Sequence, residues 1–336
     1  MKKKVCIWLL ALLLLGNACS WEVLAAVNET LENPASDTDY VWINPMYEDV
    51  MEEDQLVQEI TKESEPQEER AGASSSSFLS MSKAVKYLRG KLVNRNNVIT
   101  VNVRTNNVAT GSLARTLFEK AVAVNSKTTG QEGDYILYHL GGYQANIRYS
   151  LLQPGRYTVT YSVYYYTTKS QEAKVTAKVK RVLNSLGVKK MTTYNKIKTI
   201  YDYICKNVKY DRSTSGSYGK FTAYQAIMNG SAVCQGYASL FYRMAMDAGV
   251  RARVMPGESR SVPHAWNIVK LGAYYYNVDS TWDAGMSTYS YFMKSNKDFP
   301  DHTRDSEYQT TSFQKAYPVA AASYRKASAA RAKRAS

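Results

Sequence analysis

Apolar and polar positions divide the chain into a mixed first part and a second part that opens with helices. In residues 78–166, apolar residues recur at helical spacing in two stretches, and elsewhere they alternate with polar residues as in half-buried strands. The helical stretches are 81–92 and 113–122, and the strand-like stretches are 98–103, 135–140, 144–149 and 156–166. We therefore expect a small α/β accessory domain over residues 78–166. No group of catalytic side chains stands out in it, and His139 is interpreted as a strand residue.

From residue 170 onward, helical spacing returns and is followed by the pattern of a hairpin. The apolar stripes of three expected helices lie at 175–186, 197–208 and 238–248. Two alternating stretches, His264–Lys270 and Ala273–Asp279, then predict a pair of antiparallel strands. This order predicts a second domain over residues 167–322, of the α+β class, with helices ahead of an antiparallel sheet.

Cys234 is placed at or just before the start of the third of these helices. The unsatisfied N–H groups and the positive dipole end of a helix favour a thiolate, which is the nucleophilic form of cysteine. Gly230 and Gly236 on either side allow the backbone to approach a ligand closely. A cysteine at a helix start also fits a purely structural role, so a catalytic interpretation requires a partner base.

The hairpin supplies such a partner. With a two-residue turn at Leu271-Gly272, His264 lies directly opposite Asp279. Directly opposed residues share a face of the sheet, with Cβ atoms about 4.5–5.5 Å apart. A carboxylate at that distance can hold one imidazole nitrogen and leave the other to take a proton from Cys234. The sequence therefore predicts a Cys234, His264 and Asp279 triad.

Two alternatives stay open at this point. A four-residue loop would pair His264 with Thr281 instead, and Asp283 is a second candidate for the acid. Cys205 lies at the edge of the 197–208 stripe and is interpreted as a small core residue. A disulfide between Cys205 and Cys234 would remove the nucleophile and leave a stapled secreted domain.

Three ordered motifs resemble those of the transglutaminase-like superfamily of thiol enzymes. They are Ala232-Val233-Cys234-Gln235-Gly236-Tyr237-Ala238, His264-Ala265-Trp266-Asn267 and Tyr276-Asn277-Val278-Asp279-Ser280-Thr281-Trp282-Asp283. The resemblance covers roughly residues 170–300. It implies a papain-like α+β core, in which a Cys-bearing helix packs on an antiparallel sheet, and a triad of Cys234, His264 and Asp279.

The resemblance also implies an activity. We expect a cysteine-dependent acyl-transfer enzyme that acts on peptide or protein amides through a thioester. Transfer to water makes it a peptidase or amidase, which the similarity to the short bacterial form favours, whereas transfer to an amine makes it a cross-linking transglutaminase. A non-catalytic binding module of the cell envelope is the alternative from another class.

Further site residues are expected beside the triad. Gln235, Trp266 and Tyr224 are interpreted as substrate-binding residues, and Tyr224 or Gln225 as a side-chain donor to the oxyanion. No cofactor is expected. A metal site is not expected either, because no second histidine lies near the triad in sequence, and His302 is interpreted as a surface residue. No EF-hand motif occurs, which leaves calcium binding open.

Composition excludes several further classes of protein. The chain has 336 residues, 45% of them hydrophobic and 21% charged, as in an ordinary globular protein. Four Cys without a CxxC motif and three His exclude zinc ribbons and fingers. Neither a P-loop nor a GxGxxG motif is present, so nothing favours nucleotide binding.

The first residues of the chain predict export. Residues 1–26 have a basic start, an apolar run too short to span a bilayer, and small residues after it, as in a signal peptide. A lipid anchor at Cys19 is a weaker alternative. We expect a secreted or envelope-associated protein of bacterial type, with a basic tail at 323–336 and no transmembrane segment once the signal is removed.

Charge is distributed unevenly along the chain. Residues 21–70 hold 15 acidic and two basic residues, a net charge of −13, whereas residues 71–336 hold 14 acidic and 38 basic ones, a net charge of +24. Residues 27–77 therefore form an acidic, Ser-rich linker or pro-region. The basic remainder favours polyanionic partners such as anionic cell-wall polymers, together with the protein or peptide substrate, and nucleic acid is not expected outside the cell.

Overall fold

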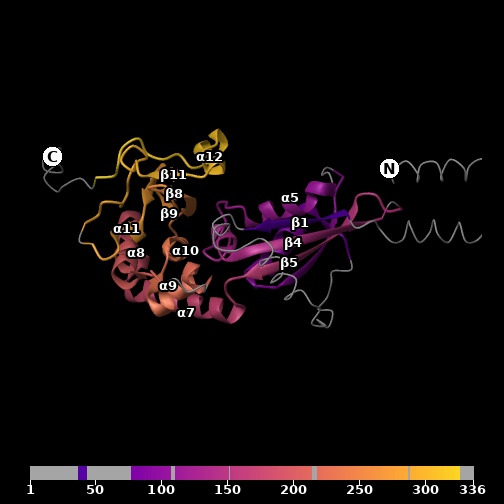
Figure 1. Cartoon of the computed structure of the whole chain (residues 1–336), viewed down its shortest axis with the longest axis horizontal. Coiled ribbons are helices and arrows are strands. Elements are labelled where there is room, and N and C mark those ends of the chain that lie inside the picture. Colours follow the sequence, from indigo (N-terminus) through magenta and orange to yellow (C-terminus); the bar gives the residue numbers. More distant parts are fainter. Residues whose placement is uncertain are drawn as a thin grey trace, which may run out of the picture.

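The computed structural model describes residues 77–106, 110–150, 152–213, 218–286 and 288–325, together with the backbone of residues 37–43. The predicted export signal, most of the acidic segment and all but residues 323–325 of the predicted tail lie outside the described residues. Two lobes lie side by side, one built around β4 and β5 and the other around α10 and the β8–β9 pair (Figure 1). No helix in the described part of the chain has the length and apolar character needed to cross a membrane.

The first lobe is a five-stranded sheet covered on one face by two helices. Its strand order is β1-β4-β5-β3-β2, antiparallel except where β2 runs parallel to β3. Buried and exposed residues alternate along β3, and the buried side packs against α4 and α5. The elements are β1 (Asp37–Ile43), β2 (Leu79–Ser80), α4 (Met81–Val93), β3 (Val98–Arg104), α5 (Thr110–Val122), α6 (Asp134–Leu137), β4 (Leu140–Tyr149) and β5 (Arg156–Tyr165).

One predicted strand of this lobe is wrong. The stretch 135–140 forms the short helix α6 and a turn, and β4 begins only at Leu140. The Asp134 carboxylate explains the difference, because it accepts hydrogen bonds from the Arg253 guanidinium (2.7 Å) and the Val254 N–H (2.8 Å) of the other lobe. His139 is likewise not a strand residue. Its buried ring contacts the Tyr135 carbonyl through Nδ1 (2.7 Å) and accepts from the Ala223 N–H through Nε2 (3.1 Å).

The acidic segment contributes a strand that the sequence did not predict. β1 pairs antiparallel with β4, with Trp42 opposite Tyr143. Part of the segment 27–77 therefore belongs to the sheet and is not linker.

The second lobe begins with helices and ends in an antiparallel sheet, and the predicted α+β class is confirmed. The four-stranded sheet has the order β10-β9-β8-β11. The longer elements are α7 (Lys169–Ser185), α8 (Thr193–Asn207), α9 (Ala223–Asn229), α10 (Cys234–Asp247), β8 (Ala252–Ser259), β9 (Val262–Leu271) and β10 (Tyr274–Val278). The shorter ones are the 3-10 helix Val188–Lys190, β6 (Lys209–Tyr210), the 3-10 helix Tyr218–Phe221, β7 (Ser231–Ala232), α11 (Ser280–Asp283), β11 (His302–Arg304), the 3-10 helix Ser306–Tyr308 and α12 (Thr311–Ala316).

Helix α10 is the centre of this lobe. Every residue from Cys234 to Met246 is buried, because α7, α8, α9 and the strands β8 and β9 surround the helix. The predicted Cys-bearing helix on an antiparallel sheet is therefore confirmed. A nucleophile at the start of such a helix is held rigidly by the whole core.

Buried charges join the two lobes next to α10. Glu172 of α7 forms an ion pair with Arg95 of the first lobe (3.0 Å) and accepts hydrogen bonds from Thr167 (2.7 Å) and Tyr135 (2.9 Å). Arg243 of α10 lies 4.0 Å from the same carboxylate. Burial raises the pKa of Glu172, but Arg95 and the hydrogen bonds outweigh burial and lower it to about 2. This cluster couples the accessory sheet to the helix that carries Cys234.

Candidate active site

Cys234 is the first residue of α10 and is 7% exposed. The first N–H groups of a helix have no carbonyl partner one turn earlier, so they point outward as hydrogen-bond donors. Cys234 is near enough to His264 to raise the pKa of its imidazole. The helix start thus places a thiol, the N–H groups of the first helical turn and an imidazole together.

His264 lies on β9 and is held by Asp279 at the end of β10. Its Nε2 is 2.7 Å from Asp279 Oδ2, and both side chains are buried. Burial lowers the pKa of His264, but the Asp279 charge, its hydrogen bond and the contact with Cys234 outweigh burial and raise the pKa to about 10. Since Nε2 is engaged with Asp279, Nδ1 is the nitrogen left for Cys234. The structure therefore brings the three predicted triad residues together.

The predicted hairpin register is nevertheless wrong by two residues. Leu271 pairs with Tyr274, so the two-residue turn is Gly272-Ala273 and not Leu271-Gly272. This register is the one left open as the alternative, which sets His264 opposite position 281, so His264 and Asp279 are diagonal neighbours and not directly opposed. A shift of two residues preserves the face on which a side chain lies, whereas a shift of one would reverse it. The contact survives for this reason.

Asp279 is a hydrogen-bond acceptor for four groups. Its Oδ1 accepts from the N–H groups of Thr281 (2.8 Å) and Trp282 (3.3 Å), which caps α11. Its Oδ2 lies between two imidazoles, those of His264 and His302. Burial alone would raise the pKa of Asp279, but the two histidines hold it well below its usual range. The carboxylate is thus an anion in a fixed orientation.

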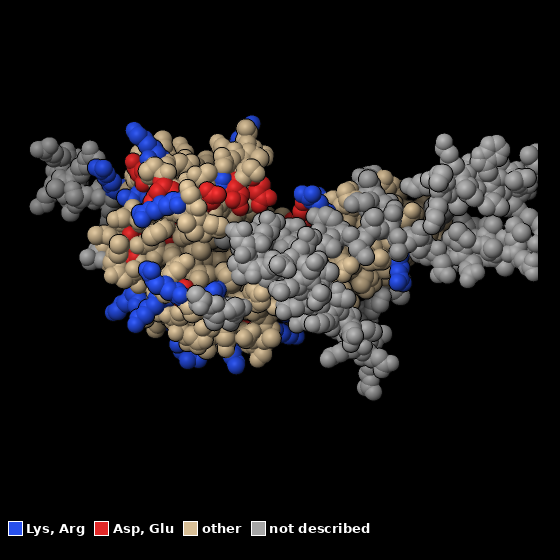
Figure 2. Space-filling model, viewed as in Figure 1, with Lys and Arg blue, Asp and Glu red and all other residues tan. Residues whose placement is uncertain are grey.

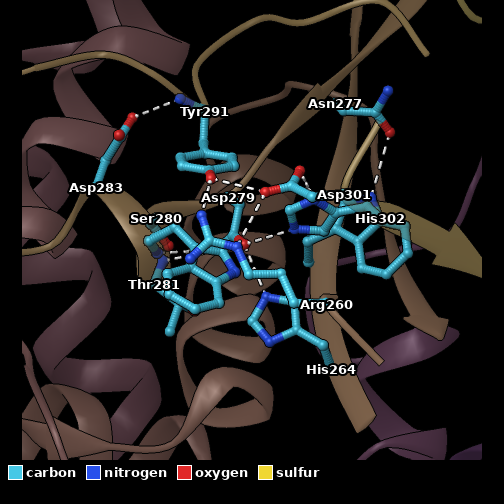
Figure 3. Close-up of polar contacts among 12 residues, drawn as sticks. Arg260, His264, Asn277, Asp279, Ser280, Thr281, Asp283, Tyr291, Asp301 and His302 are labelled. Carbon is cyan, nitrogen blue, oxygen red and sulfur yellow. Dashed lines mark hydrogen bonds and ion pairs between the residues drawn. The ribbon is translucent and has the colours of Figure 1, made fainter. Parts of the chain in front are cut away.

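His302 is the site residue that sequence reasoning missed. Its side chain is fully buried and is not at the surface as expected. Nε2 lies 3.0 Å from Asp279 Oδ2, and Nδ1 lies 2.8 Å from Asp301 Oδ1, so the ring bridges two carboxylates (Figure 3). Strand β11 places it there by pairing with β8, with His302 opposite Ser259. A positioning role for His302 follows, since it fixes the acid that fixes His264.

Asp283, the second candidate for the acid, has another set of partners. It accepts from the Tyr201 hydroxyl (2.6 Å) and from the N–H groups of Ser290 (3.0 Å) and Tyr291 (3.1 Å). These bonds attach the 288–291 loop to α8. Asp283 therefore stabilises the fold around the triad without touching His264.

The three expected substrate-binding residues take structural positions. Gln235 is fully buried and donates to the Tyr138 carbonyl (2.6 Å) in the other lobe. Trp266 is buried in a core cluster and donates to Asn277 Oδ1 (3.2 Å). Tyr224 is half-buried against the main core. The expectation that Gln235 and Trp266 line the cleft is corrected by their burial, and none of the three borders the cavity next to His264.

The alternative disulfide is also excluded, because Cys205 and Cys234 are both free thiols. Cys205 packs at the edge of the core, with Sγ 3.5 Å from the Ser280 carbonyl. Burial and nearby carboxylates raise the pKa of the Cys205 thiol. The two cysteines thus differ in environment, and only Cys234 has a histidine partner among the described residues.

His264, Asp279 and His302 are also grouped closely enough to bind a metal ion, with their ligand atoms within 4.8 Å of one another. The sequence argument against a metal site relied on the lack of a second histidine nearby, and His302 overturns that argument. The three side chains already hydrogen-bond one another through Asp279 Oδ2. A cation would therefore have to displace the hydrogen bonds that the two histidines make with Asp279.

Part of this chain matches a known family and known proteins. Residues 180–280 match the model of the Transglutaminase-like superfamily. The Kyphoscoliosis peptidase of Homo sapiens is 29% identical over 130 residues, which cover 34% of this chain and 20% of that protein. The Kyphoscoliosis peptidase of Mus musculus is 30% identical over 105 residues, 27% of this chain and 16% of that protein. The chain thus spans about a fifth or less of these relatives.

Among solved structures, the crystal structure of a TGase is similar at 17% identity and a TM-score of 0.33, over 68% of this chain and 60% of that one. The family match begins inside α7 and covers Cys234, His264 and Asp279. Residues 180–280 are therefore similar to a domain of the transglutaminase-like superfamily.

Proposed function

We propose that this protein is a cysteine peptidase or amidase that cleaves peptide amides through a thioester on Cys234. The observation that carries the proposal is the buried 2.7 Å contact between His264 and Asp279, with Cys234 beside His264 at the start of α10. The relatives named as peptidases support hydrolysis over cross-linking.

The reaction begins with attack of the Cys234 thiolate on the amide carbonyl carbon, which forms a C–S bond. The oxyanion accepts hydrogen bonds from N–H groups at the start of α10, the Cys234 N–H first among them. The His264 imidazolium then donates its proton to the leaving nitrogen as the C–N bond breaks. Asp279 keeps the charged imidazole in place because its carboxylate is already oriented.

The second half regenerates the enzyme. His264 removes a proton from a water molecule as that water attacks the thioester carbonyl. The C–S bond then breaks, which releases a carboxylic acid and regenerates the Cys234 thiolate. If an amine takes the place of water, the same steps give a transamidated product. The two activities share the triad and differ only in the acceptor.

The proposal is tested by iodoacetamide labelling across pH and by cleavage of a peptide library, in the native protein, Cys234→Ala and His264→Ala. Because the pKa of His264 is raised to about 10, we expect fast labelling of Cys234 even at pH 6, and loss of that speed in His264→Ala. Cys205 is the internal control, since burial keeps its thiol protonated. Slow labelling of both cysteines, with no cleavage by the native protein, would refute the enzyme proposal and favour a binding module.

Secretion by the predicted signal stays part of this proposal. Fractionation of the expressing cells tests it, with the processed N-terminus identified by peptide mapping. Recovery of the unprocessed chain in the cytosol would contradict export.

A further inference from the structure

A cavity of about 780 Å³ opens next to His264, and its charged lining has a single sign. Sixteen residues line it, among them the cations Lys206, Lys209, Arg212 and Arg260, and none of the sixteen is acidic. Exposed apolar groups of Tyr210, Val262 and Met286 complete its walls. The cavity is thus a basic site with apolar edges. The inference about its ligand rests on the function proposed above.

The cations of this cavity are largely uncompensated. Within the described ranges, Lys206, Lys209 and Arg212 are exposed and form no ion pair. Arg260 alone is partly neutralised, by Asp301 at 3.5 Å. Figure 2 shows Lys and Arg spread along the lower and left margins of this lobe, with Asp and Glu gathered in a band across its upper part.

Arg260 is aimed at the cavity by a strained turn. Arg260 and Ser261 join β8 to β9 with positive φ at both positions (55° and 62°), the conformation of a type I′ turn, which usually requires Gly or Asn. The guanidinium lies 4.5 Å from the centre of the Trp282 ring and contacts the Tyr291 hydroxyl at 3.0 Å (Figure 3). A non-glycine residue kept in such a turn and stacked in this way indicates a functional position.

Two buried polar atoms in the cavity wall have no partner in the structure as described. They are Ser259 Oγ, on a residue only 2% exposed, and the Trp282 Nε1–H. Both atoms lie beneath the cavity surface, so a ligand in the cavity reaches them only if the wall shifts.

The position of the cavity relative to the triad assigns its occupant. Its wall includes His264, which protonates the leaving nitrogen, but not Cys234, which keeps the acyl group. We propose that the cavity binds the leaving-group side of the substrate and selects an acidic peptide segment there. The same positive field repels a protonated lysine side chain, so it disfavours an amine acceptor and favours hydrolysis over cross-linking.

Quenched-fluorescence peptides identical except for two residues after the scissile bond test this selection. Glu-Glu, Gln-Gln and Lys-Lys versions should follow that order of kcat/KM, with at least tenfold between Glu-Glu and Lys-Lys at low ionic strength. Lys209→Glu should reduce that ratio several-fold. Lys86→Glu, an equal charge change on an exposed lysine of the first lobe, should leave it unchanged. Equal cleavage of all three peptides would overturn the selection while leaving the peptidase intact.

A second measurement works without a known substrate. The rate of Cys234 alkylation by anionic iodoacetate, divided by that of neutral iodoacetamide, reports the field at the site. The ratio should fall several-fold in Lys209→Glu and stay unchanged in Lys86→Glu. An identical ratio in all three proteins overturns the inference, whereas slow alkylation by both reagents refutes the proposed function instead.

Discussion

Replacing Glu172 by Gln tests whether the buried charge cluster holds the two lobes together. The change removes the anion that faces Arg95 at 3.0 Å and leaves this buried cation without a carboxylate, whereas Arg243, 4.0 Å from Glu172, keeps Asp247 at 2.8 Å. Removing one member of a buried ion pair typically costs about 3–5 kcal/mol. The pKa gives a second measure: lowering it from 4.5 to about 2 corresponds to about 3 kcal/mol at neutral pH. The two routes agree on a loss of about 3–5 kcal/mol.

The loss must also depend on pH in a defined direction. A carboxylate whose pKa is lowered by folding stabilises the protein above its unfolded pKa of about 4.5, and that stabilisation disappears as pH falls towards 2. The native protein and Glu172→Gln should therefore differ most above pH 5 and converge as the solution is acidified.

Urea unfolding at pH 7, followed by melting temperatures between pH 3 and 7, measures both effects. Glu119→Gln is the matched control, because Glu119 pairs with Arg115 at 2.7 Å on the surface and such pairs contribute less than about 1 kcal/mol. A loss below about 1 kcal/mol in Glu172→Gln, or an unchanged gap between the two proteins from pH 7 to pH 3, would refute the role assigned to this cluster.

Three further predictions concern the catalytic side. His302→Phe removes a hydrogen bond to a charged acceptor, commonly about 1.5–3 kcal/mol, so kcat/KM should fall about 10- to 100-fold. Unchanged kinetics would show that Asp279 keeps its orientation without His302. Gly257→Ala would place a Cβ against the Thr303 carbonyl and separate β11 from β8, so activity should fall as in His302→Phe. Gly90→Ala is the control, because open space surrounds Gly90, and it should leave activity unchanged. Dialysis against EDTA should leave peptide cleavage unchanged, because the triad hydrogen bonds are complete without an ion; a loss that zinc or calcium restores would contradict this.

Local patterns predicted much of the second lobe. Helical spacing located α7, α8 and α10, and alternation located β9 and β10, because one-sided burial leaves a period in the sequence. The triad was predicted from the face of the hairpin on which His264 and Asp279 lie. That face is unchanged although the turn was placed one residue too early, because the register shifts by two residues. Where burial has a simple period, sequence reasoning was sufficient.

Interactions between distant segments could not be predicted in this way. His302 reaches Asp279 only because β11 pairs with β8, and a three-residue strand leaves almost no periodic signal. The segment that begins at Asp134 is a helix and not a strand, because the Asp134 carboxylate binds Arg253 and the Val254 N–H of β8. Gln235 was expected at the cleft, but its amide is directed to a carbonyl of the other lobe. Each of these errors concerns a polar residue whose partner is far away in sequence.

The residues that match the family model and the residues that hold the candidate active site in shape are not the same in this chain. The family match ends at residue 280, ahead of β11 and the imidazole that bridges Asp279 and Asp301, and it starts after Glu172. A fragment cut to the limits of the match would keep the nucleophile, base and acid, yet lose the side chains that orient the acid and anchor the central helix. The three predicted triad residues thus lie within one matched segment, while the contacts that hold them in place come from residues on both sides of it.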